Sequence, residues 1–285
     1  VRGNEITLSG DTDAVGKAKA LVEELLAMTR AGHDLAPSDV SSSARMLRQE
    51  GGPRPSEVLG EAILTTRGKV IRPKTLGQKE YVDAIEENTV VFGIGPAGTG
   101  KTYLAVRLAV DGLRAGEYQK LILCRPAVEA GEKLGFLPGD FQAKINPYLR
   151  PLYDALNDVL GMEQVKRYIE REIIEIIPLA YMRGRTLNNS FIILDEGQNT
   201  TVSQMKMFLT RLGMGSKVIA NGDVTQFDLP EDQLSGLVHA GSIFRDIPGI
   251  GWVELEKMDI VRHPLVKKIV EAYEAATEDS RQQDK

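Results

Sequence analysis

Cysteine, long apolar runs and metal-ligand spacings are scarce or missing in this sequence. The single cysteine, Cys124, excludes an internal disulfide and is typical of a protein from the reducing cytoplasm. No apolar run approaches the roughly 20 residues that cross a bilayer, so we expect no membrane span. The start, Val1 to Glu5, has neither a secretory signal nor an initiator methionine. We therefore expect a cytoplasmic chain that begins inside a longer protein.

The three histidines, His33, His239 and His263, show no metal-ligand spacing, so we expect neither zinc nor haem. A formal net charge of -5 argues against a chain that coats nucleic acid over its whole surface, but it is compatible with a local basic patch. What the chain does have is 42% hydrophobic residues over 285 positions, enough for a sizeable core. One large domain with a small appendage is the expected organisation.

Residues 1–32 predict one strand and one helix. Polar and apolar residues alternate over 5–9, which indicates a strand, and apolar positions at helical spacing predict a helix over 14–28. Asp11 or Thr12 is available as its N-cap. Because one strand and one helix cannot bury a core, this segment looks like the end of a small domain.

Residues 33–73 have the composition of a linker with little regular structure. A short helix is compatible with the sequence over 37–49, and a glycine-proline run at 51–55 breaks any element there. The stretches 63–66 and 69–72, separated by two residues, predict a hairpin.

Residues 74–276 alternate between helical patterns, as at 78–87 and 101–115, and short apolar runs. These runs predict strands over 90–94, 120–124, 173–177, 191–194, 217–220 and 252–255. Apolar strands separated by amphipathic helices favour an α/β domain with a mostly parallel sheet covered by helices on both faces. The polar residues 277–285 are expected to fray.

A glycine-rich loop connects the first of these strands to a helix. It reads Gly95-Pro96-Ala97-Gly98-Thr99-Gly100-Lys101-Thr102 and matches the pattern G-x-x-x-x-G-K-[ST]. In such a loop, backbone N–H groups surround phosphate oxygens at the positive end of the helix. Lys101 is expected to reach the β- and γ-phosphates of ATP, and the Thr102 hydroxyl to bind Mg²⁺. A chance match is the alternative, and the strand and helix around the loop argue against it.

Two carboxylates follow the apolar run 191–194. Asp195 is expected at the carboxyl end of a core strand, where open α/β sheets bind ligands, and we assign it to the Mg²⁺ shell. Glu196 is expected to orient or deprotonate the attacking water, which favours hydrolysis over transfer to an alcohol. The alternative is an acidic pair that only ends the strand and caps a helix.

Two further polar positions are candidates for the same site. Gln226, supported by Asp223, follows the run 217–220 and would sense the γ-phosphate; a turn signal with Asx hydrogen bonds is the alternative. The amide of Gln78 can donate and accept at once, as reading an adenine edge requires. An ordinary residue at a helix start is the alternative for Gln78.

Together these motifs resemble the PhoH family, and the resemblance covers residues from about Asn4 to about Tyr273. The stretches 125–140, 144–154 and 195–200 look like hallmark segments of that family. The resemblance implies the first RecA-like domain of a superfamily 1 helicase, with Gln78 as the adenine-reading Q motif and Gly222-Asp223-x-x-Gln226 as motif III. Residues 1–32 look like the second half of a KH-like domain, without its GXXG loop.

The resemblance also implies partners. Family members are similar to ring ATPases, so we expect a homo-oligomer, a hexameric ring, in which Arg262 of a neighbour completes the site; a solvated arginine is the alternative. For single-stranded RNA, Arg125 stands where helicases grip a strand, and Tyr181, Arg183 and Arg185 would offer charge and a stacking surface. A solvated turn explains the last two arginines as simply.

Three functions remain in competition. The first is an ATPase linked to RNA remodelling or processing, with helicase activity as one form of it. The second is a small-molecule P-loop kinase, and the third a slowly hydrolysing scaffold that assembles with nucleotide. Asp195-Glu196 together with Gly222-Asp223-x-x-Gln226 favours the ATPase over the kinase. The sequence does not separate the ATPase from the scaffold.

Overall fold

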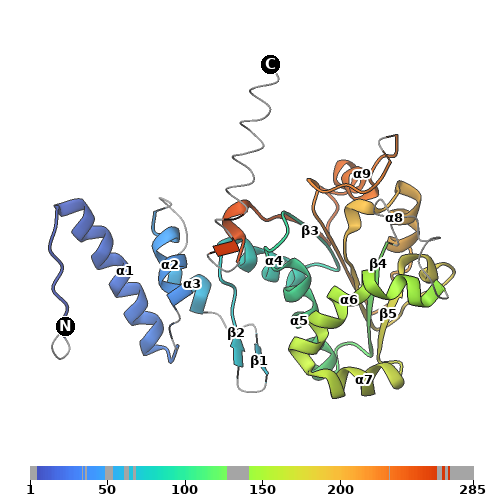
Figure 1. Ribbon diagram of the computed structural model, residues 1–285, viewed down its shortest axis with the longest axis horizontal. Coiled ribbons are helices and arrows are strands. Elements are labelled where there is room, and N and C mark those ends of the chain that lie inside the picture. The colour runs from blue at the N-terminus through green and yellow to red at the C-terminus, as the bar shows by residue number, and fades with distance from the viewer. Residues whose placement is uncertain are drawn as a thin grey trace.

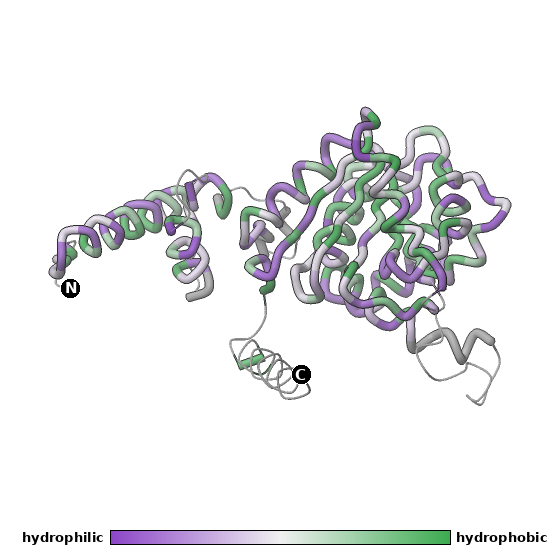
Figure 2. Tube along the Cα trace, turned by 90° about the horizontal axis from the view of Figure 1, so that it is seen from above, coloured by the Kyte–Doolittle hydropathy of each residue, from purple (hydrophilic) through white to green (hydrophobic). Residues whose placement is uncertain are grey.

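The computed structural model describes residues 5–33, 35, 37–48, 54–60, 64–66, 69–126, 141–230, 232–261, 265, 266 and 269. Three N-terminal helices lie beside an α/β domain, and the long first helix extends away from it (Figure 1). The view from above shows the same arrangement, with the N-terminal helices to one side of the domain (Figure 2). Within the described ranges, no helix is both long and apolar enough to cross a bilayer.

The N-terminal helices are α1 (Thr12–Arg30), α2 (Pro37–Met46) and α3 (Pro55–Gly60). The Asp11 carboxylate accepts a hydrogen bond from the Ala14 N–H at 2.8 Å, which confirms Asp11 as the N-cap of α1. The prediction of a strand over 5–9 is wrong, because residues 6–9 belong to no helix or strand. No neighbouring strand pairs with them in the described part of this segment, and an unpaired strand has no ladder to stabilise it.

A small core joins these helices to the start of the domain. Its side chains come from all three helices and from the next one along the chain: Leu25, Met28, Met46, Val58, Leu59 and Leu76. Helix α3 begins at Pro55, inside the run where a break was expected, because proline suits the first helical position, whose N–H needs no partner. The predicted hairpin is confirmed, with β1 (Leu64–Thr66) antiparallel to β2 (Lys69–Ile71).

The α/β domain follows the predicted alternation closely. Its helices are α4 (Leu76–Glu87), α5 (Lys101–Ala115), α6 (Phe141–Leu160), α7 (Met162–Glu170), α8 (Val202–Leu209) and α9 (Gly236–Ile243). Its strands are β3 (Val90–Ile94), β4 (Lys120–Arg125), β5 (Ile174–Pro178), β6 (Ser190–Leu194), β7 (Lys217–Gly222) and β8 (Ile250–Glu254). Short 3-10 turns complete it: η2 (Leu179–Met182), η3 (Gly197–Asn199) and η4 (Lys257–Asp259).

These strands form one sheet in the order β5-β4-β6-β7-β3-β8. Every neighbouring pair in it is parallel, so the mostly parallel sheet that was expected is parallel throughout. Strand β7 lies between β3 and β6. Because the carboxyl ends of parallel strands meet at one edge, the glycine loop after β3, the 221–226 run and Asp195 are brought side by side there.

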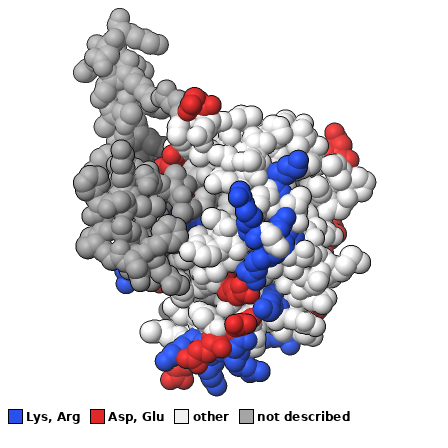
Figure 3. Space-filling model, turned by 90° about the vertical axis from the view of Figure 1, so that its right-hand side faces the viewer, with Lys and Arg blue, Asp and Glu red and all other residues white. Residues whose placement is uncertain are grey.

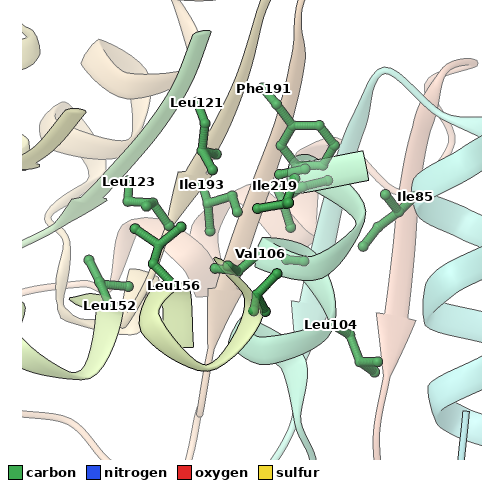
Figure 4. Packing of buried hydrophobic residues seen from close by; sticks show 14 of the residues in the cluster. Ile85, Leu104, Val106, Leu121, Leu123, Leu152, Leu156, Phe191, Ile193 and Ile219 are labelled. Carbon is green, nitrogen blue, oxygen red and sulfur yellow. The ribbon is translucent and has the colours of Figure 1, made fainter. Parts of the chain in front are cut away.

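Alternate side chains of the strands pack on opposite faces of the sheet. Leu121 and Leu123 of β4 belong to the core under α4–α7, whereas Ile122 and Cys124 belong to the core under η2, α8 and α9. Figure 4 shows the first core, in which side chains of the strands meet those of α5 and α6. Burial on both faces explains why these strands are almost continuously apolar in sequence.

Candidate nucleotide site

The loop between β3 and α5 has the backbone shape that its glycines predicted. Gly100 precedes α5 with φ of 84°, in the left-handed region that a side chain disfavours. Gly95 passes so close to the chain after β8 that an added Cβ would lie 2.5 Å from the Leu255 carbonyl oxygen. Both positions therefore require glycine, and the curled loop leaves its N–H groups at the start of a helix, where anions bind.

Lys101 folds over this loop and is largely buried. Its Nζ donates to the carbonyl oxygens of Gly95 at 2.6 Å and Pro96 at 3.0 Å, and to Thr99 Oγ1 at 3.2 Å. Burial lowers the pKa of Lys101, against the opposing effect of nearby carboxylates, Asp223 first. The ammonium group is thus held at the mouth of the loop, within reach of an anion placed on it.

Thr102 and Asp195 form the part of the site suited to a cation. Thr102 Oγ1 donates to Asp195 Oδ1 at 2.6 Å, and the Asp195 N–H donates to the Cys124 carbonyl at the end of β4. Burial raises the pKa of Asp195, and Arg125 and the Thr102 hydroxyl oppose that shift. A hydroxyl and a carboxylate that converge in this way are hard oxygen ligands, which fit Mg²⁺ completed by water and phosphate oxygens. Among the described residues, no cluster of three or more His, Cys, Asp or Glu forms a further metal site.

Glu196 lies beside this pair in an unusual backbone conformation, with φ of 55°. Its Oε1 accepts from Arg125 Nη2 at 2.8 Å, and its Oε2 accepts from Gln198 Nε2 at 2.6 Å. Arg125 also donates to the Tyr148 carbonyl of α6 at 3.0 Å. The carboxylate is therefore fixed from two sides, which is the positioning that orienting a water molecule requires.

Gln198 is a further candidate site residue that sequence reasoning missed. It is fully buried in η3, and its Nε2 donates to the Gln226 carbonyl at 3.0 Å as well as to Glu196. Its Oε1 accepts from the Asp223 N–H at 3.0 Å. One amide side chain thus connects the candidate catalytic carboxylate to the turn after β7. A glutamine three positions after the strand-end aspartate was the only signal in the sequence.

The turn after β7 reaches the glycine loop through Asp223. Its Oδ2 accepts from the Ala97 N–H at 3.1 Å and from Gln226 Nε2 at 2.8 Å, and its Oδ1 accepts from Thr225. Asp223 therefore touches the loop directly, while the Gln226 amide is turned toward Asp223. The Asx-type bonds to Thr225 also form, as the turn alternative predicted, and sensing of the γ-phosphate by Gln226 stays a prediction.

Gln78 adjoins the loop from the start of α4. Its Oε1 accepts from the Lys74 N–H at 2.8 Å, and its Nε2 donates to the Thr99 carbonyl at 2.9 Å. Both ends of the amide bind the protein itself in this structure, so adenine reading by Gln78 stays a prediction.

Most of the predicted catalytic and metal-binding residues line one cavity of 360 Å³. They come from the ends of four strands and the following turns: Lys101, Thr102, Arg125, Asp195, Glu196 and Gln226. The remaining candidates lie elsewhere. Tyr181 and Arg183 are exposed around η2, and Arg185 forms a two-bond ion pair with Glu175 at 2.8 and 2.9 Å. Arg262 lies outside the described residues.

A glycine loop with this lysine, a threonine beside a strand-end aspartate and an all-parallel sheet define a P-loop nucleotide-binding protein. The particular family follows from comparison with known proteins. The family model for PhoH-like protein matches residues 70–274, and the chain belongs to that family.

Relatives extend the match to nearly the whole chain. A PhoH-like protein of Mycobacterium tuberculosis (strain H37Rv) is 57% identical over 273 residues, which is 96% of this chain and 78% of that protein. PhoH-like protein of Bacillus subtilis is 55% identical, over 96% of this chain and 86% of its own length. Protein PhoH of Escherichia coli K12 is 40% identical, over 93% and 73%. Among solved structures, the Hef helicase domain of Pyrococcus furiosus matches 65% of this chain and 38% of its own, at 12% identity and a TM-score of 0.38.

Proposed function

We propose that this chain hydrolyses ATP with Mg²⁺ and couples hydrolysis to single-stranded RNA as a homo-oligomeric ring. The observation that supports hydrolysis most directly is the position of Glu196. It lines the same cavity as Lys101 and the Thr102–Asp195 pair, and two donors hold its carboxylate. A fixed acid beside a phosphate site suits activation of water.

Each residue then has a distinct task. Lys101 and the N–H groups of the loop bind the β- and γ-phosphates, and Thr102 with Asp195 would hold the metal ion. Mg²⁺, when bound, neutralises charge that develops on the phosphate oxygens. Glu196 orients the attacking water, since each of its oxygens can accept a further hydrogen bond. Arg125 contributes a positive charge on the cavity wall.

Two observations support the RNA part of the proposal: basic side chains on one face of the domain, and an arginine that links the nucleotide site to α6. Figure 3 shows Lys and Arg side chains gathered on the face that lies to the right in Figure 1, where β5 forms the edge of the sheet. Exposed Arg183 and Tyr181 lie at the end of that strand and could contact a phosphate and a base. Arg125 is the candidate for transmission, because it binds both Glu196 and α6.

The ring part of the proposal assigns Arg262 to a neighbouring subunit's site. We expect Arg262→Ala to lose turnover and keep ATP binding. Mixing it with Glu196→Gln should recover part of the activity, because mixed rings contain intact composite sites. No recovery despite demonstrated subunit exchange would argue against an arginine in trans.

ATP hydrolysis measured with and without defined single-stranded RNAs tests the proposal as a whole. We expect turnover that RNA stimulates and that Lys101→Ala or Glu196→Gln abolishes. Turnover unchanged by any RNA, with rings forming only when ATP is present, would favour an assembly scaffold instead. Phosphate found on a metabolite, and not in water, would indicate a kinase.

A further inference from the structure

The Asn221 side chain, near the end of β7, is fully buried, and one half of its amide has no partner. Its Oδ1 accepts a hydrogen bond from the Tyr81 hydroxyl at 2.5 Å. Its Nδ2, in contrast, donates to no group in the described part of the chain. Buried polar groups in folded proteins are almost always paired, so an orphan donor needs a physical explanation. The two N–H bonds of Nδ2 are therefore available to a group nearby.

The Tyr81 hydroxyl decides which end of the amide is available. Tyr81 belongs to α4 and is itself fully buried. Its ring packs against β3 at Gly93, where an added Cβ would lie 2.5 Å from Tyr81 Cε2 and 2.7 Å from Asn221 Oδ1. Glycine at this position thus leaves room for the pair. Because the hydroxyl binds Oδ1, the Nδ2 end of the amide points away from Tyr81.

Asp195 is the residue that lies across from Asn221 in the sheet. The pairing of β6 with β7 extends to Leu194 and Ala220. Asp195 and Asn221 are the next residues along the two chains, so the register places them side by side. Asn221 is bound from α4 and Asp195 from α5 by Thr102, and both helices cover the same face of the sheet. Because neighbouring strands lie about 4.8 Å apart, the amide is close to the carboxylate.

Asn221 can act on the phosphate site only through Asp195. Asp195 lines the phosphate cavity, whereas Asn221 does not and has an exposed fraction of 0%. A nucleotide or metal ion in the cavity therefore cannot touch the amide. Burial raises the pKa of Tyr81, the hydrogen bond to Asn221 opposes that shift, and the charge of Asp195 adds to it. The influence of Asp195 on Tyr81 agrees with the close packing of the three side chains.

Side chains that hydrogen-bond to the ligands of a metal ion orient those ligands, and their loss typically costs about 10–100-fold in metal affinity or activity. We propose that Asn221 is a positioning residue for Asp195: its Nδ2 donates to the carboxylate and holds it in the orientation that binds Mg²⁺, and Tyr81 fixes the amide for this contact. The inference rests on the proposed function and adds to it the residue that orients the metal ligand. Gly93 belongs to the same arrangement, because a larger residue would displace the Tyr81–Asn221 pair.

Calorimetric titration of the full chain with AMP-PNP, an ATP analogue that is not hydrolysed, tests this inference. One titration contains Mg²⁺ and the other excess EDTA, so the ratio of the two affinities measures the contribution of the metal ion without any turnover. We expect Mg²⁺ to strengthen binding to the unmodified chain. In Asn221→Leu, which keeps the size and removes the amide, the ratio should fall about tenfold. Affinity in EDTA should stay unchanged, because the glycine loop and Lys101 still bind the phosphates.

A double variant separates positioning from packing. Asn221→Leu leaves the Tyr81 hydroxyl buried without a partner, so Tm should fall. Adding Tyr81→Phe removes that hydroxyl, and Tm should recover while the effect of Mg²⁺ stays reduced. Tyr81→Phe alone keeps the amide but no longer fixes it, so the ratio should fall only a few-fold.

Asn199→Leu is the matched control. Asn199 is also a buried asparagine near this edge of the sheet, but both ends of its amide are bound by Asp228. Its replacement should lower Tm and leave the effect of Mg²⁺ on AMP-PNP affinity unchanged. Thermal unfolding of each variant shows whether it folds.

Loss of the Mg²⁺ effect without loss of binding in EDTA is the result that supports this inference. An undiminished Mg²⁺ effect in folded Asn221→Leu overturns it, and so does recovery of that effect in the double variant, which would indicate packing alone. If Asn221→Leu does not fold, an unchanged Mg²⁺ effect in both Tyr81→Phe and the double variant overturns the inference. Failure of AMP-PNP to bind the unmodified chain, with or without Mg²⁺, overturns the proposed function itself.

Discussion

Two groups of arginines in this protein have opposite surroundings. Arg125, at the end of β4, lines the phosphate cavity and binds the Glu196 carboxylate and the Tyr148 carbonyl. Arg183 and Arg185 follow the edge strand β5, where the first faces solvent and the second pairs with Glu175. All three were candidates for the same task, contact with RNA.

The position of a strand in the sheet decides which groups surround the side chain that follows its carboxyl end. A residue at the carboxyl end of an inner strand has the other strand ends beside it, so Arg125 meets a catalytic candidate 71 positions away in sequence. A residue after the edge strand has neighbours on one side only. Arg183 is therefore available to a partner, whereas Arg185 is used to attach the turn to β5.

The largest expected effect is in the phosphate cavity. Glu196→Gln should lower ATP turnover about 10²–10⁴-fold and leave ATP binding intact, because the amide keeps the shape and loses the ability to accept a proton. Lys101→Ala should remove binding as well. For both variants, phosphate release measures ATP turnover and calorimetry measures ATP affinity. An active Glu196→Gln would exclude this residue as the group that activates water.

Gln198→Ala is expected to have the next largest effect. It removes the contacts that join Glu196 to the turn after β7, so kcat should fall about 10–100-fold while ATP affinity changes little. Loss of a buried amide also costs about 1–3 kcal/mol of unfolding free energy. Gln198→Glu, of similar size, serves as the comparison. Equal losses of kcat and affinity would indicate a purely structural role.

The two arginine groups can be separated directly. Arg125→Ala should lower turnover about tenfold even without RNA, because the cavity loses a positive charge and Glu196 loses a donor. Arg183→Ala should keep the basal rate and weaken only stimulation by RNA, with a smaller salt dependence of binding. If Arg125→Ala and Arg183→Ala changed basal turnover and RNA stimulation in the same way, the proposed difference between the two arginine groups would be wrong.

The smallest expected effect concerns the Arg185–Glu175 pair. Burial alone would raise the pKa of Glu175, but hydrogen bonds and charge from Arg185 and Lys120 outweigh it and bring the pKa below its ordinary value. A lowered carboxyl pKa stabilises the fold above the unfolded-state pKa, and this contribution is lost as pH falls through the folded-state pKa. Glu175→Gln should therefore cost about 0.5–1 kcal/mol at pH 7 and less at pH 3, which lies below the ordinary carboxyl pKa. Denaturant unfolding at both pH values measures this, and an equal cost at both would show that charge is not the cause.

Local patterns predicted the strands and helices of the α/β domain because burial of a strand on both faces leaves a continuous apolar run. The helix over 101–115 and the strand over 90–94 have the predicted bounds. The N-terminal segment was predicted less well. Residues 6–9 alternate as a strand would, and α3 begins at a proline in a run that looks like a break. The missing strand reflects the absence of a paired neighbour in the described part of that segment, which a local pattern does not reveal, whereas proline is compatible with both a break and a helix start.

The amino-acid sequence determined the chemistry of the phosphate site by itself. Glycines at 95 and 100 are needed for a backbone that other residues cannot follow, and Lys101, Thr102 and Asp195 are recognisable from their spacing to those glycines and to an apolar strand. Tertiary structure decided which polar side chains form hydrogen bonds within the protein and which remain exposed to a partner. Gln78 and Gln198 have the same amide, yet one holds the glycine loop and the other links Glu196 to the turn after β7, because the fold places a different distant turn beside each of them.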